Sequence, residues 1–262
     1  MIDLDLDAVL GWNSARFIEV LGGLPEDVPV PSCPDWSAGD LLWHLTSVQA
    51  HWADIVERRL PPGDSSGAGP RPERPSTHAD LVALFGSSSQ RLRAALAVAV
   101  DEEPVWTWSA DHTIGWVRRR QAHEALVHRV DAELAAGLPS EVDPVVAADG
   151  IDELLRHFAA NPPDWGSFEP SGPLVAVQSS DVTRSWVVQV GRFRGVEPEG
   201  DEVDEPDYLA APDGAGSPDV TIAGAAVDLL LWLWGRGDGA DLRATGQQAA
   251  MPALREAIVA NT

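Results

Sequence analysis

The sequence contains no lysine, one cysteine, one tyrosine and no long apolar run. Its 18 basic residues are all arginines, and with 41 acidic residues the formal net charge is −23. Such a charge argues against binding to nucleic acid or an anionic membrane, because both attract basic patches. The single cysteine, Cys33, cannot form an internal disulfide, which fits a reducing compartment. No stretch reaches the roughly 18 apolar residues that a membrane-spanning helix needs.

The composition is otherwise that of a globular protein, with 44% hydrophobic residues. The first residues, MIDLDLDAVLGW, are acidic and lack the basic region of a secretory signal. We therefore expect a cytoplasmic protein that does not bind membranes. A length of 262 residues fits one large domain or two small ones.

The first 160 residues show helical periodicity of apolar residues. The second helix follows the proline-rich connector VPVPSCPDW, and Ser37 with Asp40 forms a capping-box pattern at its start. Gly137 ends the fourth helix. Helices are expected at 4–22, 37–60, 77–96, 116–136 and 144–159, and a loop at 61–76.

After Pro163 the pattern changes to short β-branched segments bounded by Gly, Pro and Asp. Strands are expected at 173–179, 184–191, 220–222 and 241–246, with helices after 222 and near 252–260. The acidic, Pro/Gly-rich segment 197–218 is predicted to be a loop. The change divides the chain into residues 1–162 and 163–262, a helical domain followed by a smaller α+β domain.

Two residues of the fourth predicted helix have metal-ligand spacing. Glu124 and His128 are four residues apart, so their Cβ atoms lie on one face about 5–6 Å apart. His44, at the edge of the apolar stripe of the second helix, completes a His₂Glu set. Such a set leaves one position open, as in catalytic zinc sites, although nickel, cobalt, iron or manganese would also fit. His51 could replace His44, and Asp131 could orient His128 or be a solvated acid. Hydrogen-bonded core histidines are the alternative to a metal site.

Three segments resemble the maleylpyruvate isomerase family of mycothiol-dependent enzymes, within the DinB-like superfamily. They are CPDWSAGDLLWHL (33–45), RRQAHEALVHRVDAELAAG (119–137) and VTIAGAAVDLLLWLWGRGDG (220–239). The resemblance implies an N-terminal DinB-like four-helix bundle in which His44, Glu124 and His128 hold a divalent metal, zinc in the first place. It also implies that mycothiol, a small thiol built on inositol and glucosamine, is the cosubstrate.

The resemblance implies metal-activated thiol chemistry, because a nearby cation favours the thiolate. We expect S-transfer to, or thiol exchange on, an electrophilic small molecule. The sequence shows no arginine cluster for a small dianion, and its eleven tryptophans suit a larger partner. A cis–trans isomerase of the maleylpyruvate type, a hydrolase, an enzyme that uses another thiol and a non-catalytic metal-binding module remain alternatives. A monomer or homodimer is expected.

The family resemblance also implies that an arginine of the C-terminal domain contacts the substrate. Arg236 is the best match and Arg243 the second; the alternative for Arg236 is a charge at a helix C-terminus. Cys33 is expected to serve in packing. At most one or two of Arg118, Arg119 and Arg120 are expected to face the site. Tryptophans that could line the pocket, or simply pack in the core, are Trp43, Trp52, Trp106, Trp108 and Trp116.

Overall fold

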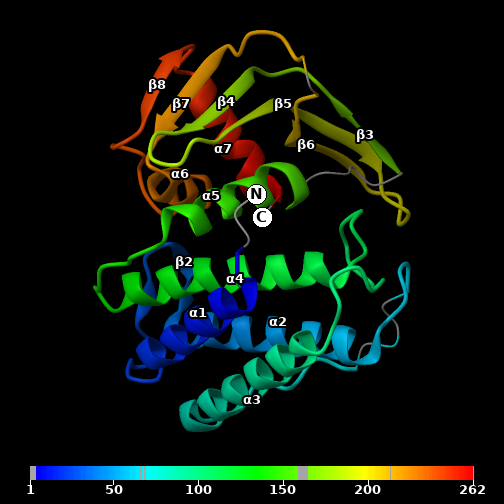
Figure 1. Ribbon diagram of the computed structural model, residues 1–262, viewed down its shortest axis with the longest axis vertical. Coiled ribbons are helices and arrows are strands. Elements are labelled where there is room, and N and C mark those ends of the chain that lie inside the picture. The colour runs from blue at the N-terminus through cyan, green and yellow to red at the C-terminus, as the bar shows by residue number, and fades with distance from the viewer. Residues whose placement is uncertain (1–3, 65–66, 68, 159–164, 213, 262) are drawn as a thin grey trace. The chain divides into compact units, whose positions relative to one another are not determined.

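Four long helices form the first of two units into which the chain divides, Met1–Glu141 and Val142–Thr262. The computed structural model describes residues 4–64, 67, 69–158, 165–212 and 214–261. The four helices are α1 (Leu6–Leu21), α2 (Ala38–Arg58), α3 (His78–Ala97) and α4 (Ile114–Ala135). They form a bundle in which α1 contacts α3 and α4, and α2 contacts the same two helices (Figure 1). None of the described helices is long and apolar enough to cross a membrane.

The helix starts follow local capping chemistry. At the start of α2, the Ser37 hydroxyl accepts from the Asp40 amide at 3.2 Å, and the Ser37 amide donates to the Asp40 carboxylate at 3.0 Å. Thr77 accepts from the amide of Asp80 in the same way at 3.2 Å. These contacts confirm the predicted helix starts. Helix α4 begins two residues earlier than expected, because Thr113 is its cap.

The proline-rich connector contains a small hairpin that the sequence analysis did not predict. Strands β1 (Pro29–Val30) and β2 (Cys33–Ser37) pair antiparallel. Strand β2 ends at the N-cap of α2, so the hairpin and the second helix are joined without a spacer. The hairpin contacts α2 and α4.

The bundle buries polar side chains as well as apolar ones. Trp52 and Trp116 are each 5% exposed and belong to one of its apolar clusters, so both serve in core packing. A second apolar cluster includes Phe17 and Phe85. Seven buried polar residues lie on α4 alone: Arg120, Gln121, His123, His128, Arg129, Asp131 and Glu133. A helix that served only in packing would bury apolar residues at these positions. The buried polar side chains therefore mark α4 as a candidate for a functional site.

The second unit begins with α5 (Pro144–Glu153), which continues into a π-helical turn, η1 (Leu154–Phe158). A six-stranded sheet follows, with the order β3-β5-β4-β7-β8 and β6 paired to β5. Its strands are β3 (Gly166–Glu169), β4 (Leu174–Ser179), β5 (Ser185–Val196), β6 (Glu202–Ala210), β7 (Val220–Gly224) and β8 (Arg243–Gly246). Helices α6 (Ala226–Leu233) and α7 (Ala250–Asn261) pack against the sheet.

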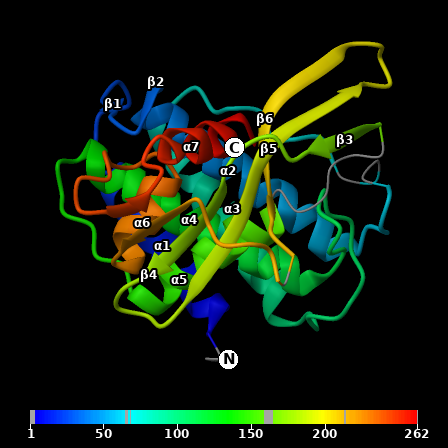
Figure 2. The same ribbon diagram turned by 90° about the horizontal axis from the view of Figure 1, so that it is seen from above.

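Strand β6 corrects the prediction of a loop over 197–218. It pairs antiparallel with β5 along nine residues, from Val188↔Ala210 to Val196↔Glu202. Figure 2 shows the two strands as a ribbon that extends beyond the neighbouring strands. Acids and Pro206 suggested a loop, but an edge strand tolerates proline and exposed charge because only one side is paired.

Helix α5 belongs to the C-terminal unit, whereas the sequence analysis assigned residues 144–159 to the helical domain. Trp186 of β5 donates through Nε1 to Asp152 of α5 at 2.8 Å, and the Tyr208 hydroxyl of β6 donates to the Leu154 carbonyl at 2.8 Å. These contacts tie α5 and η1 to the sheet, in agreement with the division of the structure between Glu141 and Val142. The predicted boundary at 162/163 lies outside the described residues. The predicted fold class, a helical bundle followed by an α+β domain, is confirmed.

Two glycines of the sheet are covered by aromatic rings across the strand pair β3–β5. A Cβ added at Gly166 would lie 2.1 Å from the Phe193 ring, and one at Gly191 would lie 2.2 Å from the Glu169 carbonyl oxygen and 2.6 Å from the Phe168 ring. Phe168 and Phe193 face each other in the register. Each ring therefore occupies the space that a side chain on the opposite glycine would need.

Candidate metal centre

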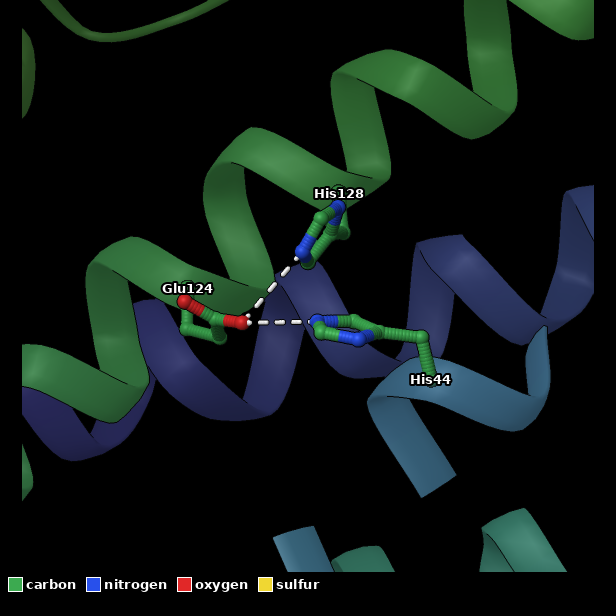
Figure 3. Close-up of side chains that lie close together, drawn as sticks. All are labelled: His44, Glu124 and His128. Carbon is green, nitrogen blue, oxygen red and sulfur yellow. Dashed lines mark hydrogen bonds and ion pairs between the residues drawn. The ribbon is translucent and has the colours of Figure 1, made fainter. Parts of the chain in front are cut away.

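Three side chains of the bundle converge on one point. His44 comes from α2, and Glu124 and His128 come from one face of α4. The Nε2 atom of His44 lies 3.2 Å from Oε1 of Glu124, and Nε2 of His128 lies 3.3 Å from the same oxygen (Figure 3). The ligand atoms of all three residues lie within 4.8 Å of one another.

The chemistry and spacing of these donors fit a divalent metal. Zinc binds imidazole nitrogen and carboxylate oxygen at about 2.0–2.2 Å, and in a tetrahedron such bonds put neighbouring donor atoms about 3.3 Å apart. The two nitrogen–oxygen distances to Glu124, 3.2 and 3.3 Å, match that separation. The His44 side chain is 33% exposed, so the set is open to solvent on one side.

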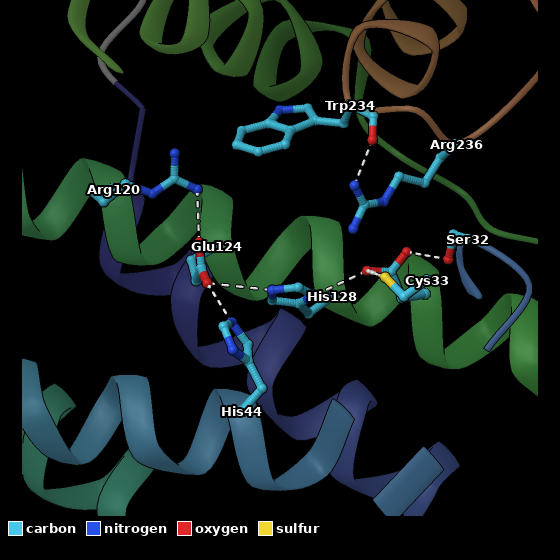
Figure 4. Close-up of polar contacts among 9 residues, drawn as sticks. Ser32, Cys33, His44, Arg120, Glu124, His128, Trp234 and Arg236 are labelled. Carbon is cyan, nitrogen blue, oxygen red and sulfur yellow. Dashed lines mark hydrogen bonds and ion pairs between the residues drawn. The ribbon is translucent and has the colours of Figure 1, made fainter. Parts of the chain in front are cut away.

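A buried carboxylate fixes the orientation of one imidazole. Asp131, fully buried, lies 2.9 Å from Nδ1 of His128. The Ser32 hydroxyl donates to the other Asp131 oxygen at 2.5 Å, and the Cys33 sulfur lies 4.0 Å from Asp131 (Figure 4). With Nδ1 engaged in this way, Nε2 is the nitrogen that His128 presents to Glu124 and His44. Asp131 thus has the orienting position suggested by the sequence, and Cys33 packs beside it.

Trp36 of β2 stacks against the two histidines. Its ring centroid lies 4.8 Å from that of His44 and 6.1 Å from that of His128, and it is nearly parallel to the latter ring, at 29°. The indole restricts both imidazoles and forms an apolar wall beside the donor atoms. The sequence analysis did not single out Trp36 or Ser32.

The ionisable side chains of the centre change one another's pKa values. Burial raises the pKa of Glu124, but hydrogen bonds from His128 and His44 outweigh burial and hold that pKa well below its usual range. Burial lowers the pKa of His128, but the hydrogen bonds to Asp131 and Glu124 raise it to about 9. The carboxylate is therefore ionised at neutral pH, and a cation that binds Nε2 must displace the His128 proton.

Two family models cover most of the chain. The one described as mycothiol maleylpyruvate isomerase N-terminal domain matches residues 11–133, and the one described as MDMPI C-terminal domain matches residues 145–253. The chain belongs to the mycothiol maleylpyruvate isomerase family. No curated protein matches it.

Two solved crystal structures have the same fold as this chain. They are the crystal structures of the mycothiol-dependent maleylpyruvate isomerase and of a histidine-to-alanine mutant of it. The TM-scores are 0.56 and 0.59, respectively, and both alignments cover 92% of each chain at 14% sequence identity.

The structure separates the other candidates of the bundle. His51 is not part of the donor set among the described residues; it lines a separate cavity of about 150 Å³ with Asp54 and Arg71. Arg118 is 11% exposed and pairs with two exposed acids, Asp7 and Asp101. Arg120 instead donates from Nη2 to Oε2 of Glu124 at 3.1 Å.

The remaining tryptophan candidates divide in the same way. Trp106 packs against the cluster that contains Trp52, and Trp43 packs against the second apolar cluster. Trp108 is 47% exposed and lies edge-on to Trp116. Core packing therefore describes Trp43 and Trp106, and among the described residues Trp36 is the tryptophan that contacts His44 and His128.

Arg236 follows α6 in the C-terminal unit. Its backbone amide donates to the Leu231 carbonyl at 2.6 Å, and its Nη1 donates to the carbonyl of Trp234 (Figure 4). The neighbours Gly235 and Gly237 have φ values of 80° and 143°, which favour glycine. The backbone is thus held in a specific turn, and the substrate contact expected of Arg236 stays a prediction. Arg243, the second candidate, is exposed at the start of β8.

Proposed function

We propose that this protein is a mycothiol-dependent metalloenzyme that joins mycothiol, through its sulfur, to an electrophilic small molecule, by addition or by displacement of a leaving group. The observation that carries the proposal is the convergence of His44, Glu124 and His128 in a chain of this family. Three protein donors with solvent on one side have the composition of a catalytic zinc site, which keeps a position for a further ligand.

A divalent ion held by these residues would lower the pKa of a thiol sulfur and so supply a thiolate nucleophile at neutral pH. Glu124 supplies the negative charge of the donor set, and Asp131 keeps Nε2 of His128 directed at the ion. Trp36 limits the approach of water from its side. Such thiol chemistry requires a reducing compartment, which the cytoplasm provides.

Arg236 has the second role in the proposal. Its planar guanidinium would pair with a carboxylate or enolate oxygen of the electrophile. That charge grows when the thiolate adds to a double bond conjugated with a carbonyl, so the pairing would strengthen in the transition state.

Cis–trans isomerisation is the second candidate function. The names of both matching family models and of the solved structures with this fold favour it. In an isomerase the thiolate adds to the alkene, a bond rotates and the thiol leaves unchanged. The transferase consumes the thiol, whereas the isomerase regenerates it.

Stoichiometry distinguishes the two functions. Zinc-loaded protein is incubated with mycothiol and either chlorodinitrobenzene or maleylpyruvate, and thiol, adduct and isomer are quantified. Equimolar loss of thiol with formation of an adduct supports transfer, and product formation at constant thiol supports isomerisation. His128→Ala is the control without a complete donor set. Full metal occupancy without turnover of any electrophile would favour the non-catalytic module.

A further inference from the structure

One arginine of α4, Arg120, contacts Glu124 of the candidate metal centre at the oxygen that does not face the two histidines. We infer that Arg120 tunes this centre for an anionic ligand, by fixing the orientation of Glu124 and by offsetting one buried negative charge. The inference rests on the proposed function, because it concerns the ligand that would complete the donor set. Arg120 acts through Glu124 and is therefore a positioning residue.

The geometry divides the two oxygens of Glu124 between different tasks. Arg120 lies one helical turn before Glu124, is 3% exposed and donates to Oε2 at 3.1 Å. The other oxygen, Oε1, faces both imidazole nitrogens. Because Oε2 is engaged by the guanidinium, Glu124 presents a single oxygen to an ion, and a coordination position is left for a further ligand.

The charges of the N-terminal unit around the donor set give Arg120 a second task. Among the contacts described for the donor set, Glu124 and Asp131 are carboxylates and Arg120 is a cation, whereas Ser32 and Trp36 carry no charge. The guanidinium of Arg120 offsets the negative charge of the Glu124 carboxylate that it contacts. An anion that joins a divalent ion at this site is therefore repelled less than it would be beside Glu124 without Arg120.

Removal of the Arg120 charge would take away this offset. A bound thiolate would then place its negative charge near a Glu124 carboxylate that has lost the Arg120 guanidinium. An uncompensated negative charge is costly at low dielectric, so anions should lose affinity while neutral ligands do not. A merely structural role of Arg120 would instead weaken binding of the metal and of every ligand together.

The experiment uses the full chain loaded with cobalt(II), in the wild type and in Arg120→Gln, Arg120→Lys and Arg118→Gln. Gln keeps a donor for Glu124 without the charge, and Lys keeps the charge. Arg118→Gln is the matched control, because Arg118 lies on the same helix but pairs with Asp7 and Asp101. The probes are 2-mercaptoethanol and azide as anions and imidazole as a neutral ligand. Visible spectra report binding, thermal melting reports folding, and chelator competition reports cobalt affinity.

In Arg120→Gln we expect mercaptoethanol and azide to bind about tenfold more weakly, and the sulfur-to-cobalt band to appear about one pH unit higher. Imidazole affinity and cobalt affinity should stay within about threefold of the wild type. Arg120→Lys and Arg118→Gln should bind mercaptoethanol, azide and imidazole with the affinities of the wild type.

Two outcomes overturn the inference alone: a wild-type sulfur band that Arg120→Gln leaves unmoved, or equal weakening of imidazole and the anions. If Arg120→Gln does not fold, Arg120→Lys decides: loss of anion binding in this charged, folded variant also overturns it. A wild-type protein that binds cobalt but shows no sulfur band contradicts the proposed function itself.

Discussion

Buried polar residues are distributed unequally between the two units of this protein. Among the described residues, fifteen buried polar or charged side chains lie in the N-terminal unit. The C-terminal unit buries three, Glu153, Ser179 and Asp207. Its sheet and helices bury mainly apolar side chains, such as Trp186, Val188 and Leu230.

The difference indicates that the N-terminal unit bears the larger cost of burying polar groups. A polar group buried without a partner costs about 1–3 kcal/mol, so each needs a hydrogen bond to offset burial. Arg129 illustrates this: it donates to Asn13, to Glu133 and to the Glu141 carbonyl. Such networks hold the helices in one arrangement, which a site built from two helices requires.

Loss of metal is the largest effect that the comparison predicts. His128→Ala and His44→Ala should each reduce bound divalent metal from about one ion per chain to nearly none, because two remaining donors bind weakly. His78→Ala is the control, since His78 pairs with Glu26 outside the donor set. Elemental analysis of the purified variants measures the content. Full metal occupancy in both variants would show that His44 and His128 are not the ligands of the metal.

The C-terminal unit contributes one predicted functional residue, Arg236, and its removal tests whether chemistry is confined to the bundle. Arg236→Ala should lower kcat/KM on the order of 10²-fold, a few kcal/mol, with little change in Tm, and lysine should restore only part of the activity. A charge at a helix end predicts the reverse, a stability loss of about 0.3–1 kcal/mol with normal turnover. Kinetics and melting of both variants decide between them.

Ion pairs in the two units should differ in their contribution to stability. Arg129 and Glu133 are 1% and 4% exposed, so Arg129→Met should cost about 3–5 kcal/mol by leaving a buried carboxylate short of a partner. Arg192 of β5, which pairs with Asp204, is 36% exposed, and Arg192→Met should cost about 0–1 kcal/mol. Urea unfolding measures both. Equal costs would contradict the comparison.

The smallest predicted effect concerns pH and the cap of α2. The hydrogen bond from the Ser37 hydroxyl, aided by Arg74, lowers the pKa of Asp40 from 3.8 to about 2. A lowered carboxyl pKa stabilises the fold above pH 4, and this contribution disappears as the pH falls through 2. Asp40→Ala should therefore cost about 1 kcal/mol at pH 7 and less near pH 2. Asp35→Ala, an exposed acid of β2, serves as the control in urea unfolding at each pH. A difference that does not shrink with acid would contradict this explanation.

The sequence predicted what depends on short spacing. The four-residue step from Glu124 to His128 and the capping residues of α2 are local, and both appear as expected. Ser32 and Trp36 were missed as neighbours of the site. Ser32 meets Asp131 across 99 residues of chain, a contact that no periodicity encodes.

The missed strand β6 has the same cause. Its composition, EVDEPDYLA, is unfavourable for an isolated strand, and pairing with β5 overrides that preference. The position of α5 likewise depends on distant contacts, since Trp186 and Tyr208 of the sheet bind it and η1. Tertiary contacts determine that β6 is a strand and that α5 belongs to the C-terminal unit. Local composition does not contain this information.

The close packing over Gly166 and Gly191 leaves neither position room for a side chain. Alanine at Gly166 would collide with Phe193, and alanine at Gly191 would collide with Phe168. A smaller residue in place of Phe193 or Phe168 would remove the ring but not the backbone. The added Cβ would still lie 2.8 Å from the Arg194 carbonyl oxygen at position 166, and 2.2 Å from the Glu169 carbonyl oxygen at position 191. Relatives of this chain should therefore keep glycine at both positions, whichever residues stand opposite.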